Sequence, residues 1–487
     1  MKKTLLTLFL VILSALIISC AGDETAVGET TVNTADTAET TAEVIEDKLP
    51  EQIDMDGFTL RILNNDPSWF SWANTVITVE EITGDALNDV IYNRTSTVEQ
   101  YYNAVIEETM LNDVSGVLKS MVMSGEDTYD MVMLFNASNL TDAFVGGLLD
   151  SWDNLENLQT DQPWWDADAT ALYNFNGRQV ALSGDYSLYD YSTRHCYVFN
   201  KNMYADLNID VNLYQVVNEG KWTLEKLYEL GALAVMDLDG DNEFSPKIDR
   251  FGISGTVTRH YSALLAGSNV KYVDRDSSGE LFYAIPGSEY AVNTIQKIVE
   301  INQSNNTYNS GTNDIGSGDE TIFRDGRTLF TAAYINEAGK LRDMEYDIGI
   351  VPPPKLDENQ EKYLSLVEGG ALSVMPVTLS KDRYEYVGAL LDGFAFFSHR
   401  DVIPVYIELI VKSKFTRDEE SVDMLNIIFD SAIYDLGVGA WSGTFKNQYT
   451  QNIFLPRSTD VASLNEKITP TAEKALTDFN EAVRNLG

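Results

Sequence analysis

An acidic loop in the middle of the chain carries the strongest chemical signal in the sequence. Three aspartates alternate with other residues in Asp237-Leu238-Asp239-Gly240-Asp241, so their carboxylates can converge on one small centre. Calcium takes about six to eight oxygen ligands, which suits such a loop. We therefore expect a structural calcium site with the candidate ligands Asp237, Asp239, Asp241, Glu243 and Asp249.

The same loop departs from the usual calcium-binding pattern at its end. Asn242 stands at the position that needs a left-handed backbone, which asparagine tolerates. Where such loops place a bidentate glutamate the chain has Ile248, and Asp249 follows one residue later. The alternative interpretation is a solvated acidic turn that holds no ion.

Aromatic residues gather in loops that follow expected strands, and as a group they favour a binding site. Flat apolar rings stack on the C–H faces of sugars, while neighbouring Asn, Asp and Glu side chains bind the hydroxyl groups. For each single ring, packing in the core is the alternative. The rings are those of Trp69, Phe70, Trp72, Trp164, Trp165, Tyr186, Tyr189, Tyr191 and Trp441.

Several enzyme motifs are absent from the sequence. It has no phosphate-binding GxxxxGK[ST] loop, no GxGxxG after a strand, no GxSxG turn and no HExxH. The three histidines, His195, His260 and His399, stand far apart, and 75 acidic residues make any chosen carboxylate pair uninformative. We therefore expect a protein that is not an enzyme, without catalytic residues or a catalytic cofactor. An anchored polysaccharide hydrolase remains the alternative.

The composition excludes some partners. The 487 residues carry a formal charge of −41, whereas nucleic-acid binding needs a surplus of Lys and Arg. A hydrophobic fraction of 44% is typical of globular chains, and the length suits more than one core. We expect a folded protein that binds no nucleic acid.

The start of the chain is typical of an export signal. Two lysines precede an apolar run of 14 residues, shorter than the ~20 that span a membrane. Cys20 follows this run among small residues, as in a bacterial lipobox, so residues 1–19 are predicted to be a signal peptide and Cys20 to carry lipid. An ordinary signal peptide is the alternative. Residues 20–50, rich in Thr and Glu, are predicted to be a disordered tether.

These features predict a protein lipid-anchored to the cell membrane on its extracellular face. With Cys20 modified, Cys196 has no disulfide partner, and we expect it to be a buried structural cysteine rather than a reactive thiol.

Beyond the tether, strand-like stretches alternate with helix-like ones, which implies an α/β fold with a mostly parallel sheet. Trp222 precedes Thr223, a good N-cap, and is predicted to pack as a structural residue. Strands are expected at 58–63, 129–134, 180–182 and 196–199, and helices at 83–106, 223–236 and from Thr469-Pro470 onward.

The order of several motifs resembles the family 1 extracellular solute-binding proteins of ABC importers. The resemblance covers nearly everything from residue 55 onward; each motif is loose alone, and their order is the specific feature. Besides the lipobox and the Thr-rich tether, the motifs are Tyr129-Asp130-Met131-Val132, Gly177-Arg178-Gln179-Val180-Ala181, Val198-Phe199-Asn200-Lys201, Trp222-Thr223-Leu224, Asp237 to Gly252, Gly326-Arg327-Thr328-Leu329-Phe330 and Asp347-Ile348-Gly349-Ile350-Val351-Pro352.

This resemblance implies an α/β, two-lobe periplasmic-binding-protein-like fold of type II, with lobes joined by several crossing segments around a ligand cleft. Lobe 1 would comprise residues 51–180 and 371–402, and lobe 2 residues 181–370 and 403–487. The crossings would fall near residues 176–184, 363–372 and 400–405.

The resemblance also implies a function. The protein would capture a sugar or oligosaccharide by lobe closure and deliver it, as a monomer, to an ABC permease in the membrane. A peptide or another small solute is the alternative ligand, and an adhesive surface protein is a further alternative. The implied ligand contacts are Asn65, Asp66, Trp72, Asn136, Asp185, Tyr186, Tyr334, Glu368 and Trp441.

Overall fold

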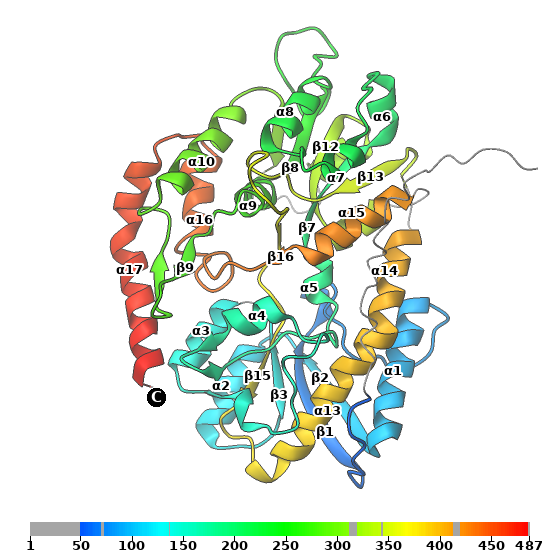
Figure 1. Ribbon diagram of the computed structural model, residues 1–487, viewed down its shortest axis with the longest axis vertical. Helices are drawn as coiled ribbons and strands as arrows, with labels where there is room; N and C mark the ends of the chain where they lie inside the picture. Colours follow the sequence, from blue (N-terminus) through cyan, green and yellow to red (C-terminus); the bar gives the residue numbers. More distant parts are fainter. Residues whose placement is uncertain are drawn as a thin grey trace, which may run out of the picture. The chain divides into compact units, whose positions relative to one another are not determined.

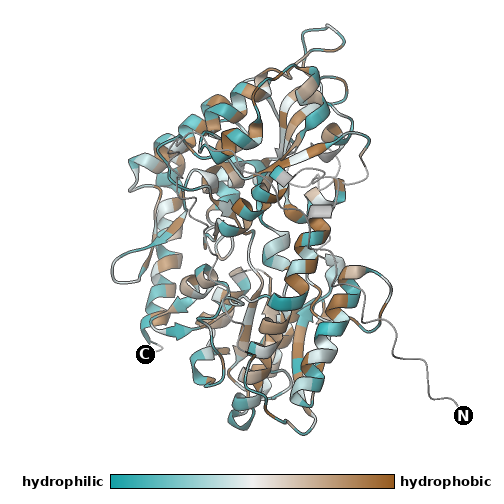
Figure 2. Ribbon diagram, turned by 45° about the vertical axis from the view of Figure 1, so that its right-hand side comes forward, coloured by the Kyte–Doolittle hydropathy of each residue, from teal (hydrophilic) through white to brown (hydrophobic). Residues whose placement is uncertain are grey.

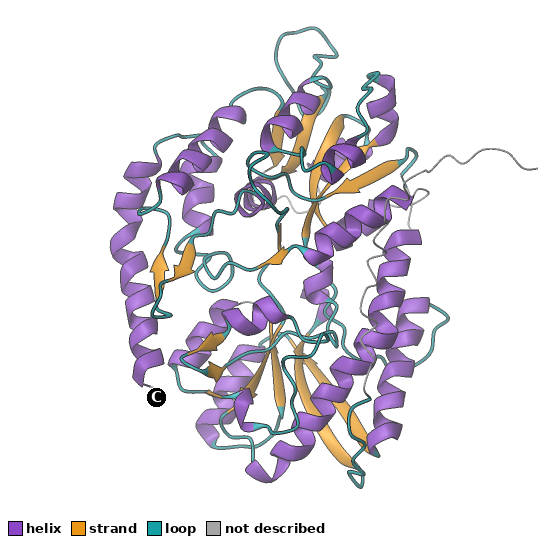
Figure 3. Cartoon of the chain, viewed as in Figure 1, coloured by secondary structure: helices purple, strands orange, loops and turns teal. Residues whose placement is uncertain are grey.

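Two five-stranded sheets form the framework of the protein (Figures 1 and 3). The computed structural model describes residues 49–69, 73–135, 137–310, 319–341, 344–412 and 419–485. The expected signal peptide, Cys20 and nearly all of the expected tether lie outside these residues. The first sheet has the strand order β2 (Ala104–Leu111), β1 (Phe58–Asn65), β3 (Met131–Leu134), β15 (Leu372–Pro376) and β4 (Leu149–Asp150).

The second sheet repeats this arrangement. Its order is β11 (Thr307–Ser310), β8 (Phe251–Thr256), β12 (Thr328–Tyr334), β7 (His195–Asn200) and β13 (Ile348–Val351). Three two-stranded ladders complete the described strands: β5 (Asn174–Phe175) with β6 (Arg178–Gln179), β9 (Val273–Arg275) with β10 (Leu281–Tyr283), and β14 (Ser365–Leu366) with β16 (Ala432–Ile433).

Both sheets are mixed, which corrects the expectation of a mostly parallel sheet. In the first, β1 pairs in parallel with β2 and β3, but β15 runs antiparallel to β3 and β4. In the second, β8 pairs in parallel with β11 and β12, but β7 runs antiparallel to β12 and β13. In β7 and β15 the chain enters each sheet directly from the other half of the molecule. These two strands are antiparallel to both of their neighbours.

Helices cover both sheets. Those associated with the first are α1 (Ala86–Tyr102), α2 (Val114–Ser124), α3 (Ala137–Val145), α4 (Ala167–Leu172), α13 (Tyr384–Phe397) and α14 (Ile403–Lys412). The others are α5 (Tyr189–Ser192), α6 (Lys201–Asp206), α7 (Leu213–Asn218), α8 (Leu224–Ala232), α9 (Val257–Gly267), α10 (Glu289–Ile301), α11 (Asp319–Arg324), α12 (Ile335–Lys340), α15 (Glu419–Asp430), α16 (Lys446–Tyr449) and α17 (Val461–Asn485).

Hydrophobic packing follows from the strand sequences. The strands β3, β7, β12 and β13 are buried along their whole length, and hydrophobic residues concentrate along the strands and on one side of the flanking helices (Figure 2). Cys196 in β7 is fully buried, as expected, and burial raises the pKa of its thiol far above its usual range. Within the described part of the chain, no helix combines the length and hydropathy needed to cross a membrane.

Two described segments connect the halves, and a third connection passes through residues outside the described ranges. The first runs from Leu182, which bridges to Ser373 at the first sheet, to His195 in β7. The second runs from Val367, which bridges to Arg194, into β15. Before the third connection, α13 packs against α1 and continues through a π-helical turn (Ser398–Val402) into α14. After it, α15 packs against β13; residues 413–418, which join α14 to α15, lie outside the described ranges.

Local signals explain which elements the sequence predicted. The strands at 58–63 and 196–199 are confirmed, and Thr223 caps α8 by accepting from the Lys226 amide at 3.3 Å. Trp222 is fully buried and donates to the Pro352 carbonyl at 2.8 Å, so it is structural.

Other expected elements were wrong. The helix expected at 83–106 ends at Tyr102, because Asn103 adopts a left-handed backbone and β2 begins at once. Residues 180–182 form no named strand, and the only local pairing is the two-residue β6 and a bridge at Leu182. The last helix runs through Pro470 from Val461, since buried residues anchor its earlier turns.

Candidate functional site

A cluster of charged and aromatic side chains lies at one edge of the second sheet. Tyr334 ends β12, and the antiparallel register places it opposite His195 at the start of β7. Thr256 ends β8 beside them and caps α9 by accepting from the Arg259 amide at 3.3 Å. Since ligands of open α/β sheets bind beyond the carboxyl ends of strands, this edge is the expected place for a site.

Glu368 forms the centre of this cluster. Its carboxylate lies 3.1 Å from His195 Nε2 and accepts from the Lys446 ammonium at 2.5 Å. Burial alone would raise the pKa of the Glu368 carboxyl, but Lys446 and His195 hold it well below its usual range. Burial also lowers the pKa of the His195 imidazole, although Glu368 opposes this. The carboxylate is therefore the stable form, and it stays a hydrogen-bond acceptor.

Tyr334 and Arg259 form the second part of the cluster. The Arg259 guanidinium lies 4.7 Å from the centre of the Tyr334 ring and pairs with Glu337 Oε1 at 2.6 Å. The His195 ring meets the Tyr334 ring edge-on, with the centroids 4.9 Å apart. The two parts of the cluster thus join through His195 and Tyr334.

We call the six residues His195, Arg259, Tyr334, Glu337, Glu368 and Lys446 the Glu368 cluster. It combines an aromatic ring with hydrogen-bond donors and acceptors, and its two acidic and two basic side chains balance in charge. The side chains of Glu368, Lys446 and Arg259 are only 14%, 16% and 12% exposed. Such a group can bind a neutral molecule rich in hydroxyls by ring stacking and charge-assisted hydrogen bonds.

The Glu368 cluster adjoins the first sheet. Tyr189 donates to the Glu368 carbonyl at 3.0 Å, and its ring lies 4.9 Å from that of Phe135, which follows β3. Gly369 has a positive φ of 84°, and a Cβ there would approach the Phe135 carbonyl at 3.4 Å. Glycine thus lets the second crossing segment turn close against the carboxyl end of β3.

Two predicted contacts lie at the carboxyl end of β1. Asn65 donates to the Met133 carbonyl at 2.8 Å, and Asp66 accepts from the Ser68 amide at 2.9 Å. Hydrogen bonds from Ser68 lower the pKa of the Asp66 carboxyl. Two further predicted contacts, Trp72 and Asn136, lie outside the described residues.

Asp185 and Tyr186 lie apart from the Glu368 cluster. Asp185 is buried, accepts from the Tyr191 hydroxyl at 2.9 Å and lies 2.6 Å from His399 Nδ1. Tyr186 packs in the core, edge-on to Trp165 and stacked on Phe394. Of the predicted contacts, the structure therefore brings Tyr334 and Glu368 together in the Glu368 cluster, and Asp185 and Tyr186 do not belong to it.

The remaining tryptophans divide between core and surface. Trp441 packs edge-on against Phe479 with centroids 5.3 Å apart. Trp164 and Trp165 are buried and donate to Asp392 Oδ1 at 2.9 and 3.0 Å. Trp69, in a short 3₁₀ turn after β1, is 68% exposed.

Sequence reasoning missed His195, Arg259, Glu337 and Lys446. His195 stands far from the other two histidines in the sequence, so no motif marks it. Arg259 lies in the first turn of α9, three residues after the N-cap Thr256 that ends β8, a signal that could have found it. Lys446 begins a four-residue helix and has no local signal.

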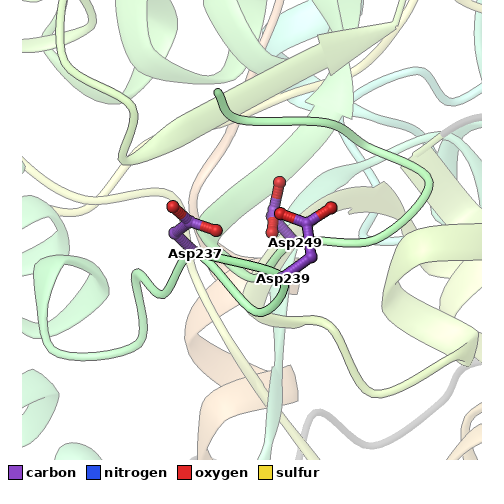
Figure 4. A group of neighbouring side chains, drawn as sticks. All are labelled: Asp237, Asp239 and Asp249. Carbon is purple, nitrogen blue, oxygen red and sulfur yellow. The ribbon is translucent and has the colours of Figure 1, made fainter. Parts of the chain in front are cut away.

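The acidic loop brings together three of its five expected calcium ligands. Carboxylate oxygens of Asp237, Asp239 and Asp249 lie within 4.8 Å of one another (Figure 4). Asn242 has φ of 64°, as its position predicted. Asp241 and Glu243 are exposed and lie outside this group.

Backbone amides already bind the carboxylates of this group. Asp249 accepts from the Leu238 and Ser245 amides at 2.8 and 2.6 Å, and Asp237 accepts from Gly240 and Asn242. Burial and the neighbouring carboxylates raise the pKa of the Asp239 carboxyl. The oxygen donor set fits a hard cation.

No family model and no curated protein matches this sequence, whereas its fold matches many solved structures. A cyclic α-maltosyl-1,6-maltose binding protein from Arthrobacter globiformis is 12% identical, with a TM-score of 0.57, over 88% of this chain and 100% of that one. M. tuberculosis UspC is 13% identical, with a TM-score of 0.56, over 87% and 100%. A Rhizobium etli sugar transporter in an open conformation is 12% identical, with a TM-score of 0.54, over 88% and 99%. Because the identities are this low, the likeness shows the fold alone. This chain has the two-lobe α/β fold of periplasmic-binding-protein-like structures.

Proposed function

We propose that this protein is a solute-binding protein that captures a sugar or oligosaccharide at the Glu368 cluster. The observation that carries the proposal is the placement of Tyr334, Glu368 and Arg259 at the carboxyl edge of the second sheet, next to the carboxyl end of the first. The structural neighbours described above include proteins named for sugar binding, which supports the same ligand class.

Binding needs no chemical step in this proposal. The Tyr334 ring stacks on a sugar face, Glu368 accepts from hydroxyls, and Arg259 and Lys446 donate to ring or hydroxyl oxygens. Contacts from both halves form only when the lobes close on the ligand, so the ligand shifts the population towards the closed form.

A calorimetric screen of the purified protein against sugars and oligosaccharides tests this proposal. We expect one sugar family to bind, with no product detected by chromatography. Tyr334→Ala and Glu368→Gln should each weaken binding, whereas Glu99→Gln, which alters a carboxylate that accepts from the Ile106 amide in the first half, should not. Consumption of the sugar would favour the hydrolase, and binding of peptides alone would replace the ligand class.

We further propose that Cys20 carries lipid at the extracellular face of the membrane and that the loaded protein delivers its sugar to an ABC permease. The lipobox-like sequence around Cys20 supports the anchor. Metabolic labelling with a radioactive fatty acid should mark the wild-type protein and not Cys20→Ser. Labelling of both proteins would contradict the anchor, and sugar uptake that persists without this protein would contradict delivery.

We also propose that the group of Asp237, Asp239 and Asp249 binds calcium in a structural role. Saturation at about one hundred times the dissociation constant adds about 2.7 kcal/mol of stability. The protein should therefore melt at a higher temperature in calcium than in chelator, and Asp239→Asn should reduce this difference. Equal melting temperatures would identify the loop as a solvated acidic turn.

A further inference from the structure

A second possible binding site is a cavity of about 190 Å³ where the two halves of the chain meet. Its walls come from residues 163–168 around the start of α4, from the crossing segment 183–194, and from residues 429–432 at the end of α15. None of its lining residues belongs to the Glu368 cluster. Apolar surface comes from the rings of Trp165, Tyr191 and Phe429.

The basic residue of this cavity is Arg194, which is only 5% exposed. Its guanidinium lies against the adjacent rings of Tyr191 and Phe429, at 5.1 and 5.4 Å from their centres, which are 5.5 Å apart. Nη1 donates to the Phe429 carbonyl. Nε is buried without an acceptor, and Nη2 has no acceptor among the described residues.

The free edge of Arg194 has a clear chemical preference. Nε and Nη2 together form the side of a guanidinium that binds a carboxylate through two parallel hydrogen bonds. Arg383 of this protein uses the same two atoms to bind Asp130, with distances of 2.7 and 2.8 Å. Arg194 has the same donors but pairs with no carboxylate in the described part of the chain, so an acceptor from a ligand would complete its hydrogen bonding.

Five carboxylates also line the cavity, but they differ in their partners. Asp185 has Tyr191 and His399, while Asp190 accepts from Ser183 at 2.5 Å and the Ala371 amide at 2.8 Å. Asp166 accepts from the Tyr434 hydroxyl at 2.8 Å. The carboxylates of Asp168 and Asp430 make no hydrogen bond or ion pair with any described residue and are exposed.

We propose that this cavity binds a small zwitterion of the α-amino acid type. The ligand carboxylate pairs with the Nε and Nη2 edge of Arg194, and the ligand ammonium pairs with Asp168 and Asp430. A simple anion would face unpaired carboxylates, and a simple cation would leave Arg194 without its acceptor. Because Asp168 belongs to α4 and Asp430 ends α15, the zwitterion would link the two halves.

Titration calorimetry with α-amino acids tests this proposal. Tryptophan fluorescence gives a second measurement of binding, because Trp165 lines the cavity. We expect at least one amino acid to bind, and its decarboxylated and deaminated analogues to bind at least about tenfold more weakly. If the decarboxylated amine binds as tightly as the amino acid, the cavity binds cations and the proposal is overturned. The absence of binding by every amino acid at millimolar concentration would overturn the proposal.

Variants separate this site from the sugar site. Arg194→Lys keeps the charge but loses the bidentate edge, so amino acid binding should fall at least about tenfold while sugar binding persists. Tyr334→Ala should do the reverse, and the exposed control Arg178→Lys should change neither. Should Arg194→Lys fail to fold, Asp430→Asn tests the ammonium contact at an exposed position. Unchanged amino acid affinity in Asp430→Asn would contradict the assignment of that contact.

Discussion

Two acidic side chains, one at each sheet, are both paired with cations, yet they lie at opposite ends of their sheets: Asp130 is fully buried and Glu368 is 14% exposed. Asp130 precedes β3 and is bound by Arg61 at 2.6 Å and by Arg383 at 2.7 Å. Glu368 is bound by Lys446 at 2.5 Å and lies beside His195, past the carboxyl ends of the second sheet. A buried ion pair therefore does not by itself mark a site; its position along the strands does.

The comparison implies different consequences for removal of each carboxylate. Asp130→Ala leaves two guanidinium groups without their partner and should destabilise the protein by about 3 kcal/mol. Its folded fraction should still bind sugar normally. Urea unfolding and calorimetry at low temperature measure these effects. Lost binding at unchanged stability would mean that Asp130 takes part in the site after all.

Glu368→Gln should show the opposite pattern. The amide keeps the shape and one acceptor, so stability should fall by only about 1–2 kcal/mol. Sugar affinity should fall by about tenfold or more, equivalent to about 1.4 kcal/mol. Urea unfolding measures the change in stability of this variant, and calorimetry measures the change in its sugar affinity. A variant that loses stability but binds sugar like the wild type would give Glu368 the same structural role as Asp130.

Arg383→Lys sharpens the structural side of the comparison. Lysine cannot reproduce the two parallel hydrogen bonds that Arg383 makes to Asp130, so stability should fall by about 1 kcal/mol, with unchanged sugar affinity. Urea unfolding measures this, with Arg178→Lys at an exposed position as the control. An equal change in both variants would show that the bidentate geometry has no special value.

The pH dependence of stability should distinguish wild type from Glu368→Gln. The folded state lowers the pKa of Glu368 from its ordinary value of 4.5, so its contribution is complete above that pH and is lost as the pH falls below it. The stability difference between wild type and variant should therefore be constant near neutral pH and shrink in acid. Urea unfolding over a pH series measures it. A difference that grows in acid would contradict the lowered pKa.

The sequence predicted the fold where the signals are local. The alternation in β1 and the N-cap of α8 depend on neighbouring residues only. The antiparallel direction of β7 and β15 could not be recognised in this way, since it depends on partners from remote segments. The break after Tyr102 was missed because a single left-handed Asn103 separates a helix from a strand.

The candidate site was partly predicted for the same reason. Tyr334 ends a recognisable strand, and Glu368 lies in the crossing segment that the resemblance to a known family implies. His195 and Lys446 meet Glu368 across 173 and 78 residues of chain, so no local pattern connects them. Asn65 and Asp66 were chosen by the same loop argument, but Asn65 donates to the Met133 carbonyl of β3 and Asp66 accepts from the Ser68 amide of its own turn.

The position of β15 has a consequence for the order in which this protein can fold. The first sheet needs β15 between β3 and β4, and Trp152, just after β4, donates to Ser373 of β15, 221 residues later in the chain. Its amino-terminal strands are therefore made long before β15, which separates β3 from β4 in the sheet. A chain leaving the ribosome cannot finish its first half until it has produced the whole second sheet. Such remote pairing slows folding, and it keeps the newly made first half incomplete for most of synthesis.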